Sequence, residues 1–345
     1  MTRLKAHRMG HRSRSFLITL LLWLFVGGIL IFLLWSQNNL LITQKYVYGD
    51  VNLPKSFVGY KVVHISDICN SKINVVKAVE KAKPDIIILS GGYSDSDGNS
   101  ENTLSTVNKL TNIAPVFYIY STNDKGNELD STKAVNVTDS IIRLNPISMD
   151  TNTFIKNNYG DKIIKKAQNK DEDAMKYIQY IQEQLSKTSN SELIIYGIGN
   201  YAYDNGVYDA SKAVMDVTDS NINITILGVL GNLNYVNEVA KTDIDTLFLG
   251  GTFGVDGALP GYKKGTYGLN GTQLFISGGV GKNPKIKRIF NFPEIQYITL
   301  SDDTITDDNP LENFISIFYN DVGTIFDNDG GFKEYKYEYD GSYSK

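Results

Sequence analysis

Residues 245–256 read DTLFLGGTFGVD and join a short apolar run to a glycine-rich turn. The run of Leu247, Phe248 and Leu249 predicts a buried strand. Residues 250–254, GGTFG, predict a flexible turn directly after that strand. Ligand sites of open α/β sheets gather at the carboxyl ends of the strands. Four more strand-and-turn units precede this one, so we expect their turns to meet at the same rim.

The sequence around this stretch alternates between strand-like and helix-like segments. Apolar, β-branched runs lie at 61–66, 85–90 and 115–120, and helical spacing of apolar residues lies between them at 73–82 and 104–110. This alternation predicts βαβ units and a largely parallel sheet. A second series of strands predicts another sheet facing the first; its members are 192–198, 222–230, 245–249, 272–277 and 295–300, with a short helix at 236–242.

Three segments interrupt or flank this pattern. Residues 44–60 contain the breakers Gly49, Pro54 and Gly59 and are interpreted as a connector. Residues 145–190 are polar and predict an insertion, whose amphipathic helix at 167–187 packs on the body or binds a partner. The acidic segment 301–345 carries alternating tyrosines and predicts a loosely held tail, with an edge strand as the alternative.

The amino terminus predicts a membrane anchor. Residues 16–35 contain no charged side chain, and twenty helical residues span about 30 Å, the thickness of a bilayer core. Five basic residues and no acid precede them within residues 1–15, which places this end in the cytoplasm and the main domain outside. The alternative is a cleaved signal peptide, but residues 36–39 lack a small-residue cleavage pattern. Residues 36–52 would then connect the anchor to the main domain.

Composition narrows the classes of function. The net charge of the chain is −4, and the basic amino terminus leaves the rest of the chain nine charges negative. An acidic body argues against nucleic-acid binding, which needs a basic face.

Cys69 is the single cysteine, so an intramolecular disulfide is excluded. The three histidines are His7, His11 and His64, and the first two precede the anchor. His64 lies inside a strand and is interpreted as a core residue.

Several stretches carry a resemblance to a known family. They are 53–57 (LPKSF), 61–67 (KVVHISD), 83–91 (KPDIIILSG), 276–281 (ISGGVG) and 286–295 (IKRIFNFPEI). The chain resembles the calcineurin-like metallophosphoesterases over residues 53–300, and most closely their single-span, membrane-anchored bacterial branch. The resemblance implies a four-layer α/β/β/α sandwich, two facing sheets flanked by helices, behind one transmembrane helix.

The family implies two metal ions that bind the substrate phosphoryl group and generate a hydroxide nucleophile. Its first motif, Asp-x-His, is here Asp67-Ile68-Cys69, so a thiol replaces the histidine. A thiolate would change the metal preference of a site. Its second motif, Gly-Asp, is here Gly91-Gly92, which removes the bridging carboxylate. Asp95 and Asp97 follow on the next loop.

The third motif, Gly-Asn-His-Asp, is here residues 121–124, STND. Thr122 replaces the ligand asparagine, Asn123 replaces the acid histidine and Asp124 is retained; a shift of one residue would instead make Asn123 the ligand. The fourth motif of the family is a histidine at the end of a strand, and Leu230 stands at that position here. The fifth motif, Gly-His-Thr-His-Gly, corresponds to residues 250–254, GGTFG. The seven expected ligand positions are therefore Asp67, Cys69, Gly92, Thr122, Leu230, Gly251 and Phe253.

Of these seven positions only Asp67 retains the expected ligand, which favours a catalytically inactive, membrane-anchored relative acting as a binding or regulatory module. We expect no cofactor, an unknown protein or small-molecule partner, and Leu230 and Phe253 filling the former metal cavity. Asp67 and Asp124 are interpreted as remnants that accept backbone hydrogen bonds.

Two alternatives remain open. One is a phosphoesterase with a divalent metal pair on unusual ligands; these are Cys69, Asp95, Asp97, Asn123 and Asp256. The other is a metal-free pocket for a phosphate-like ligand, in which the glycine-rich turns supply backbone N–H groups and lysines add charge. Its candidate lysines are Lys263, Lys264 and Lys282, for which a solvated surface is the simpler interpretation.

Overall fold

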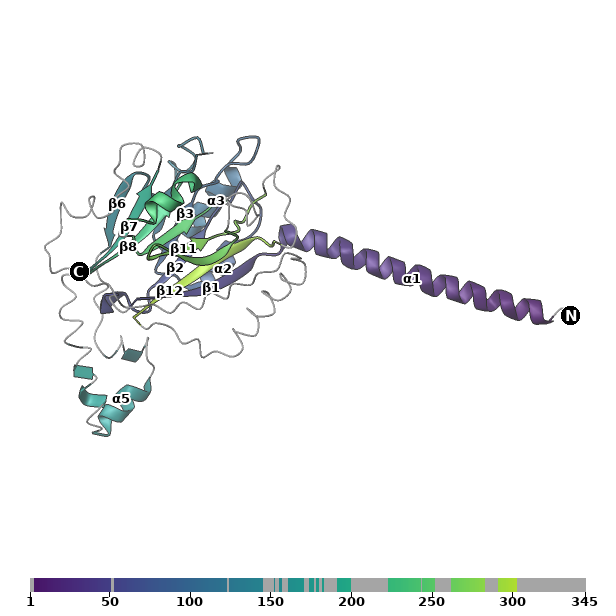
Figure 1. The fold of residues 1–345 in the computed structure, drawn as a ribbon, viewed down its shortest axis with the longest axis horizontal. Coiled ribbons are helices and arrows are strands. Elements are labelled where there is room, and N and C mark those ends of the chain that lie inside the picture. Colours follow the sequence, from purple (N-terminus) through teal and green to yellow (C-terminus); the bar gives the residue numbers. More distant parts are fainter. Residues whose placement is uncertain are drawn as a thin grey trace. The chain divides into compact units, whose positions relative to one another are not determined.

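The computed structural model contains two β-sheets, short helices and one long amino-terminal helix (Figure 1). The residues that it describes are 3–50, 53–122, 124–144, parts of 152–182, 191–199, 223–242, 244–251, 262–282 and 291–302. The predicted tail beyond residue 302 lies outside them, as do Asn123, Phe253 and Asp256.

Helix α1 (Arg3–Asn39) contains an apolar stretch, Phe16–Ser36, with a mean hydropathy of 2.8. Apart from Ser36 at its end, the described side chains of this stretch are not buried, and large ones such as Trp23 and Phe25 are exposed. A helix that is apolar all round requires an apolar environment. The stretch is long enough to cross a membrane, and both a signal anchor and a signal peptide have these properties.

The first sheet has six strands in the order β1-β12-β2-β3-β4-β5. All neighbouring pairs are parallel except β12 and β2. Its strands are β1 (Ile42–Gly49), β12 (Glu294–Ser301), β2 (Lys61–Ile65), β3 (Ile86–Ser90), β4 (Val116–Ile119) and β5 (Val135–Asn136).

The second sheet also has six strands, in the order β10-β11-β9-β8-β7-β6. Its inner pairs are parallel, and β10 and β6 are antiparallel to their neighbours. Its strands are β10 (Gly265–Leu269), β11 (Thr272–Ile276), β9 (Thr246–Leu249), β8 (Asn223–Leu230), β7 (Ser191–Ile198) and β6 (Ser140–Leu144).

A hydrophobic core joins the two sheets face to face. Ile88 and Phe117 of the first sheet belong to the same buried cluster as Leu227, Phe248 and Phe275 of the second. Both faces of the central strands are buried, because alternate residues point to opposite sides and each side is covered. This explains why β3 is a continuous apolar run rather than an alternating one.

Helices cover the outer faces of the sheets. Helices α2 (Val76–Ala82) and α3 (Glu101–Leu110) share a buried cluster with the first sheet, and α9 (Val236–Val239) shares one with the second. Lys83 ends α2 in a left-handed conformation, and Pro84 follows, a combination that stops a helix. The other short elements are η1 (Lys55–Phe57), η3 (Leu233–Tyr235) and α5 (Asp161–Gln168).

The expected strands and the two facing sheets are confirmed, with two corrections. Residues 44–60 are not only a connector, because most of β1 (Ile42–Gly49) falls in that region and the strand pairs with β12 along its whole length. Residues 295–300 belong to the first sheet rather than the second, because β12 inserts between β1 and β2. Helix α5 lies in the polar insertion but precedes most of the helix expected at 167–187, much of which falls outside the described residues.

Candidate functional site

Turns from both sheets meet at the carboxyl ends of the parallel strands. The backbone N–H of Asp67, after β2, donates to Gly91 O after β3 at 2.9 Å, and Cys69 N–H donates to Gly92 O at 2.7 Å. From the second sheet, Gly281 N–H, after β11, donates to Asp67 O at 2.6 Å. The rim that the sequence predicted therefore exists, and its members are connected mainly by backbone atoms.

Asp67 is the central residue of this rim. Its side chain is almost fully buried, and its Oδ2 accepts a hydrogen bond of 2.7 Å from the backbone N–H of Gly251, after β9. Its φ of 49° lies in the left-handed region, which Asp tolerates better than most residues. The carboxylate thus connects the first sheet to the glycine-rich turn of the second.

Gly92 and Gly279 pack directly against Asp67. A Cβ on Gly92 would lie 2.7 Å from both Cα and Oδ1 of Asp67, and one on Gly279 would lie 2.8 Å from Asp67 Cβ. Both glycines also have positive φ values, of 72° and 70°. Only glycine permits this approach without movement of the neighbouring backbone. Position 92 therefore has no room for a larger side chain in this arrangement.

Asp124 connects the turns after β3 and β4. Its Oδ2 accepts from Gly92 N–H at 3.0 Å, from Ser121 N–H at 2.8 Å and from Ser121 Oγ at 2.7 Å. Its Oδ1 accepts from Tyr93 N–H at 2.9 Å. Four donors surround the carboxylate, so the expected hydrogen-bonding role of this residue is met by its geometry.

Leu230 does not fill the rim. It belongs to the buried cluster on the outer face of the second sheet, together with Val236 and Val239 of α9. The expectation that Leu230 plugs a former metal cavity is therefore wrong, because it is Val229 that faces the other sheet. The residue beside the turn is instead Leu233, whose Cδ1 would lie 3.5 Å from a Cβ on Gly251.

His64 is a core residue, as the sequence indicated. Its Nδ1 lies 2.8 Å from Gln296 Oε1 and its Nε2 lies 2.7 Å from Ser90 Oγ. Its ring meets the edge of Phe248 with centroids 5.2 Å apart. Burial lowers the pKa of His64 to about 4, and the hydrogen bond to Gln296 opposes that shift. The imidazole is consequently neutral at physiological pH.

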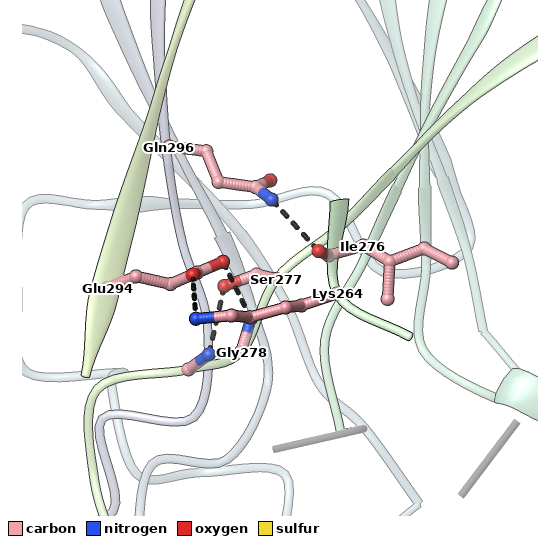
Figure 2. A network of polar contacts seen from close by, with 7 residues as sticks. Lys264, Ile276, Ser277, Gly278, Glu294 and Gln296 are labelled. Carbon is pink, nitrogen blue, oxygen red and sulfur yellow. Dashed lines mark hydrogen bonds and ion pairs between the residues drawn. The ribbon is translucent and has the colours of Figure 1, made fainter. Parts of the chain in front are cut away.

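A buried ion pair lies where β11 ends and β12 begins. Glu294, fully buried, has its Oε2 2.9 Å from Lys264 Nζ, while its Oε1 accepts from Gly278 N–H at 2.9 Å. Gln296 Nε2 donates to Ile276 O at 2.9 Å, so both side chains reach from the first sheet to the second (Figure 2). Sequence reasoning missed this network, although polar residues at 294 and 296 on one face of an apolar strand were a signal.

The residues at the rim do not fit a pair of metal ions. Among the described residues, no three His, Cys, Asp or Glu side chains come together in a group that could hold one ion. The backbone N–H of Gly251 points at the Asp67 carboxylate, and an N–H donor repels rather than binds a cation. Asp95 is used in its own loop, where Oδ1 accepts from the N–H groups of Asp97 and Asn99. Asn70 Nδ2 donates to Asp95 Oδ2 at 2.8 Å, and this bond is the main reason that the Asp95 pKa is lowered.

The family-equivalent positions are only partly brought together. Gly92 and Gly251 each lie against Asp67, and the backbone N–H of Cys69 donates to Gly92 O. Leu230 faces elsewhere, and Asn123 and Phe253 lie outside the described residues. No protein-family model matches this chain, and no curated protein matches it. The structure itself defines an α/β protein with two six-stranded, mostly parallel sheets.

Proposed function

We propose that this chain is a membrane-anchored protein with a metallophosphoesterase-like fold that lacks catalysis and acts as a binding or regulatory module outside the membrane. The packing of Gly92 against Asp67 carries this proposal. In the family that the sequence resembles, a carboxylate at position 92 bridges the two metal ions. Here glycine supplies no ligand, and Asp67 occupies the space that such a side chain would need.

The fold supports the family assignment within this proposal. Two sheets enclose one core, and helices cover the outer face of each, which matches a four-layer α/β/β/α sandwich. The turns that correspond to the family motifs follow β2, β3, β4, β8 and β9, all at the carboxyl ends of strands. Fold alone does not give function, so the rim decides the question of activity.

The anchor supports the proposed location. The apolar stretch Phe16–Ser36 follows five basic residues, and the positive-inside rule then places the sheets on the other side of the membrane. The protein would then bind a soluble partner or ligand on that side of the membrane.

Metal content and hydrolysis of the full-length protein in detergent test the proposal. We expect well below one bound ion per chain and no turnover of bis(p-nitrophenyl) phosphate with added Mn²⁺, Fe²⁺ or Zn²⁺. The variant Asp67→Asn keeps an acceptor for Gly251 N–H but removes the charge, and Glu80→Gln on the exposed side of α2 is the matched control. Stoichiometric metal, with turnover that Asp67→Asn abolishes and Glu80→Gln spares, would instead establish a phosphoesterase with unusual ligands.

A further inference from the structure

We propose that a cavity beside the end of α1 binds the phosphate group of an anionic membrane lipid. The cavity has a volume of about 630 Å³. Its wall is formed by Asn39 and Leu41, by the turn of residues 69–74 after β2, and by Lys282 after β11. The cavity adjoins the rim at Cys69, but Asp67, Gly92 and Gly251 are not among its lining residues. This inference rests on the membrane anchoring proposed above.

The charge of the cavity suits a phosphate. Among the described residues that line the cavity, Lys72 and Lys282 are charged and exposed, and none is Asp or Glu. Within the described part of the chain, neither ammonium group has a carboxylate partner, whereas Lys264 is paired with buried Glu294. Two ammonium groups at one cavity, neither paired with a carboxylate of the described residues, attract the oxygens of a phosphate. Ser71 also lines the cavity and adds a hydroxyl group that can donate a hydrogen bond.

The position of the cavity suits a lipid rather than only a soluble anion. Asn39 lies three residues beyond Ser36, the end of the apolar stretch, which is about 5 Å of helix. The headgroup region extends roughly 5–8 Å beyond the hydrocarbon core on each side. Helical geometry continues to this point, since Asn39 Nδ2 donates to Trp35 O at 2.7 Å. The cavity therefore opens at the depth of lipid phosphates.

The lining also combines polar and apolar groups as a lipid requires. Leu41 and Ile73 contribute apolar side chains, while Lys72, Lys282 and Ser71 contribute polar ones. A phosphodiester headgroup with its glycerol needs both kinds of contact, whereas inorganic phosphate needs only the polar groups. A free phosphate shares the same charge chemistry, so the experiment must separate these two sources.

Native mass spectrometry of the full-length protein in detergent provides the test. We expect phosphatidylglycerol to be retained at least about tenfold more tightly than phosphatidylcholine. The double variant Lys72→Gln/Lys282→Gln should bring phosphatidylglycerol to the level of phosphatidylcholine. The control Lys77→Gln/Lys109→Gln removes the same charge from exposed positions of α2 and α3 outside the cavity and should behave as wild type. Millimolar inorganic phosphate should not displace the lipid.

Two results would overturn the proposal. Equal retention of phosphatidylglycerol by the wild type and by the cavity variant would show that Lys72 and Lys282 do not bind the lipid. Lysine-dependent binding of inorganic phosphate, without preference for phosphatidylglycerol, would assign the cavity to a soluble anion. The intact mass of the same sample separates this test from the proposed function: loss of residues 16–35 contradicts the anchor, whereas an intact chain without lipid preference contradicts only the lipid site.

Discussion

Asp67, Cys69 and Asn70 all have positive φ values in the turn after β2. A left-handed conformation costs roughly 1–2 kcal/mol for an ordinary residue, and less for Asp and Asn. The contacts of the turn with its neighbours must offset this cost. They include the bonds from Gly251 N–H to the Asp67 side chain and from Gly281 N–H to the Asp67 carbonyl. Backbone N–H groups that donate to the carboxylate and to the carbonyl of Asp67 therefore hold the centre of the rim.

Replacement of Gly92 by alanine tests this close packing. Gly92 and Gly126 both have positive φ, but a Cβ at 126 has no atom within 4 Å, whereas one at 92 meets Asp67 at 2.7 Å. Both variants bear the backbone cost, and only Gly92→Ala adds overpacking of about 1–3 kcal/mol. Urea unfolding should therefore show Gly92→Ala to be less stable than Gly126→Ala by about that amount. Equal unfolding free energies of the two variants would mean that Asp67 does not fill the space beside Gly92.

His64 predicts a pH dependence of stability. The pKa of His64 is about 4 in the folded chain and near 6.5 when unfolded, so the unfolded chain binds more protons between these values. The contribution of neutral His64 to the free energy of unfolding should be fully present above pH 6.5 and should fall as the pH drops towards 4. From pH 7 to pH 5 the loss attributable to His64 is about 2 kcal/mol.

The variant His64→Gln isolates this contribution, because glutamine does not titrate and still offers polar atoms to Ser90 and Gln296. Unfolding free energies at pH 7 and pH 5 should drop less in the variant than in the wild type. The same drop in both proteins would show that His64 is not buried in its neutral form.

At the scale of elements, strands with both faces buried were the easiest to predict from sequence. Segments such as β3 and β9 are apolar runs of four or five residues bounded by turn residues, and that length favours a buried strand over a helix. Strand β1 was missed, because the breakers Gly49, Pro54 and Gly59 indicated a connector, although the alternating exposure of the strand is typical of a half-buried one. The sheet that β12 joins depends on pairing between residues far apart in sequence, which local patterns do not encode.

The network of β12 shows the same limit for polar residues. Glu294 and Gln296 alternate with apolar residues, so they share one side of the strand. That this side faces β11 and Lys264, rather than water, follows only from the assembled sheets. Lys264 was interpreted as a solvated lysine, and the structure corrects this. Loss of Lys264 would leave a buried carboxylate with one fewer partner, which is costly in a core.

The candidate site was predictable in its location but not in its packing. The glycine-rich turns after β3 and β9 indicated a rim, and substituted ligand positions such as Gly92 could be read from the motifs. The closure of the rim could not, because it depends on distances between turns of different sheets. An apolar plug was expected from Leu230, yet the alternation of β8 turns that side chain to the outer face.

The described part of the molecule combines a long exposed apolar helix with two sheets that are connected by contacts within the chain. The two sheets are joined by one apolar cluster, by Asp67 with Gly251 and by the side chains of β12. If these contacts hold the sheets together, metal ions contribute nothing to the folding free energy. This differs from proteins in which metal binding and folding are coupled.

Thermal unfolding of the full-length protein with chelator and with added metal tests this independence. We expect the melting temperature to change by less than about 1 °C with EDTA or with millimolar Mn²⁺ or Zn²⁺, because only ligands bound by the folded state stabilise it. A site filled at 100 times its Kd would stabilise by about 2.7 kcal/mol, which raises the melting temperature by roughly 5–10 °C for a domain of this size. A rise of that order, abolished in Asp67→Asn, would place a metal at the rim. A rise that persists in Asp67→Asn would place it elsewhere and leave the closed rim of Asp67, Gly92 and Gly279 intact.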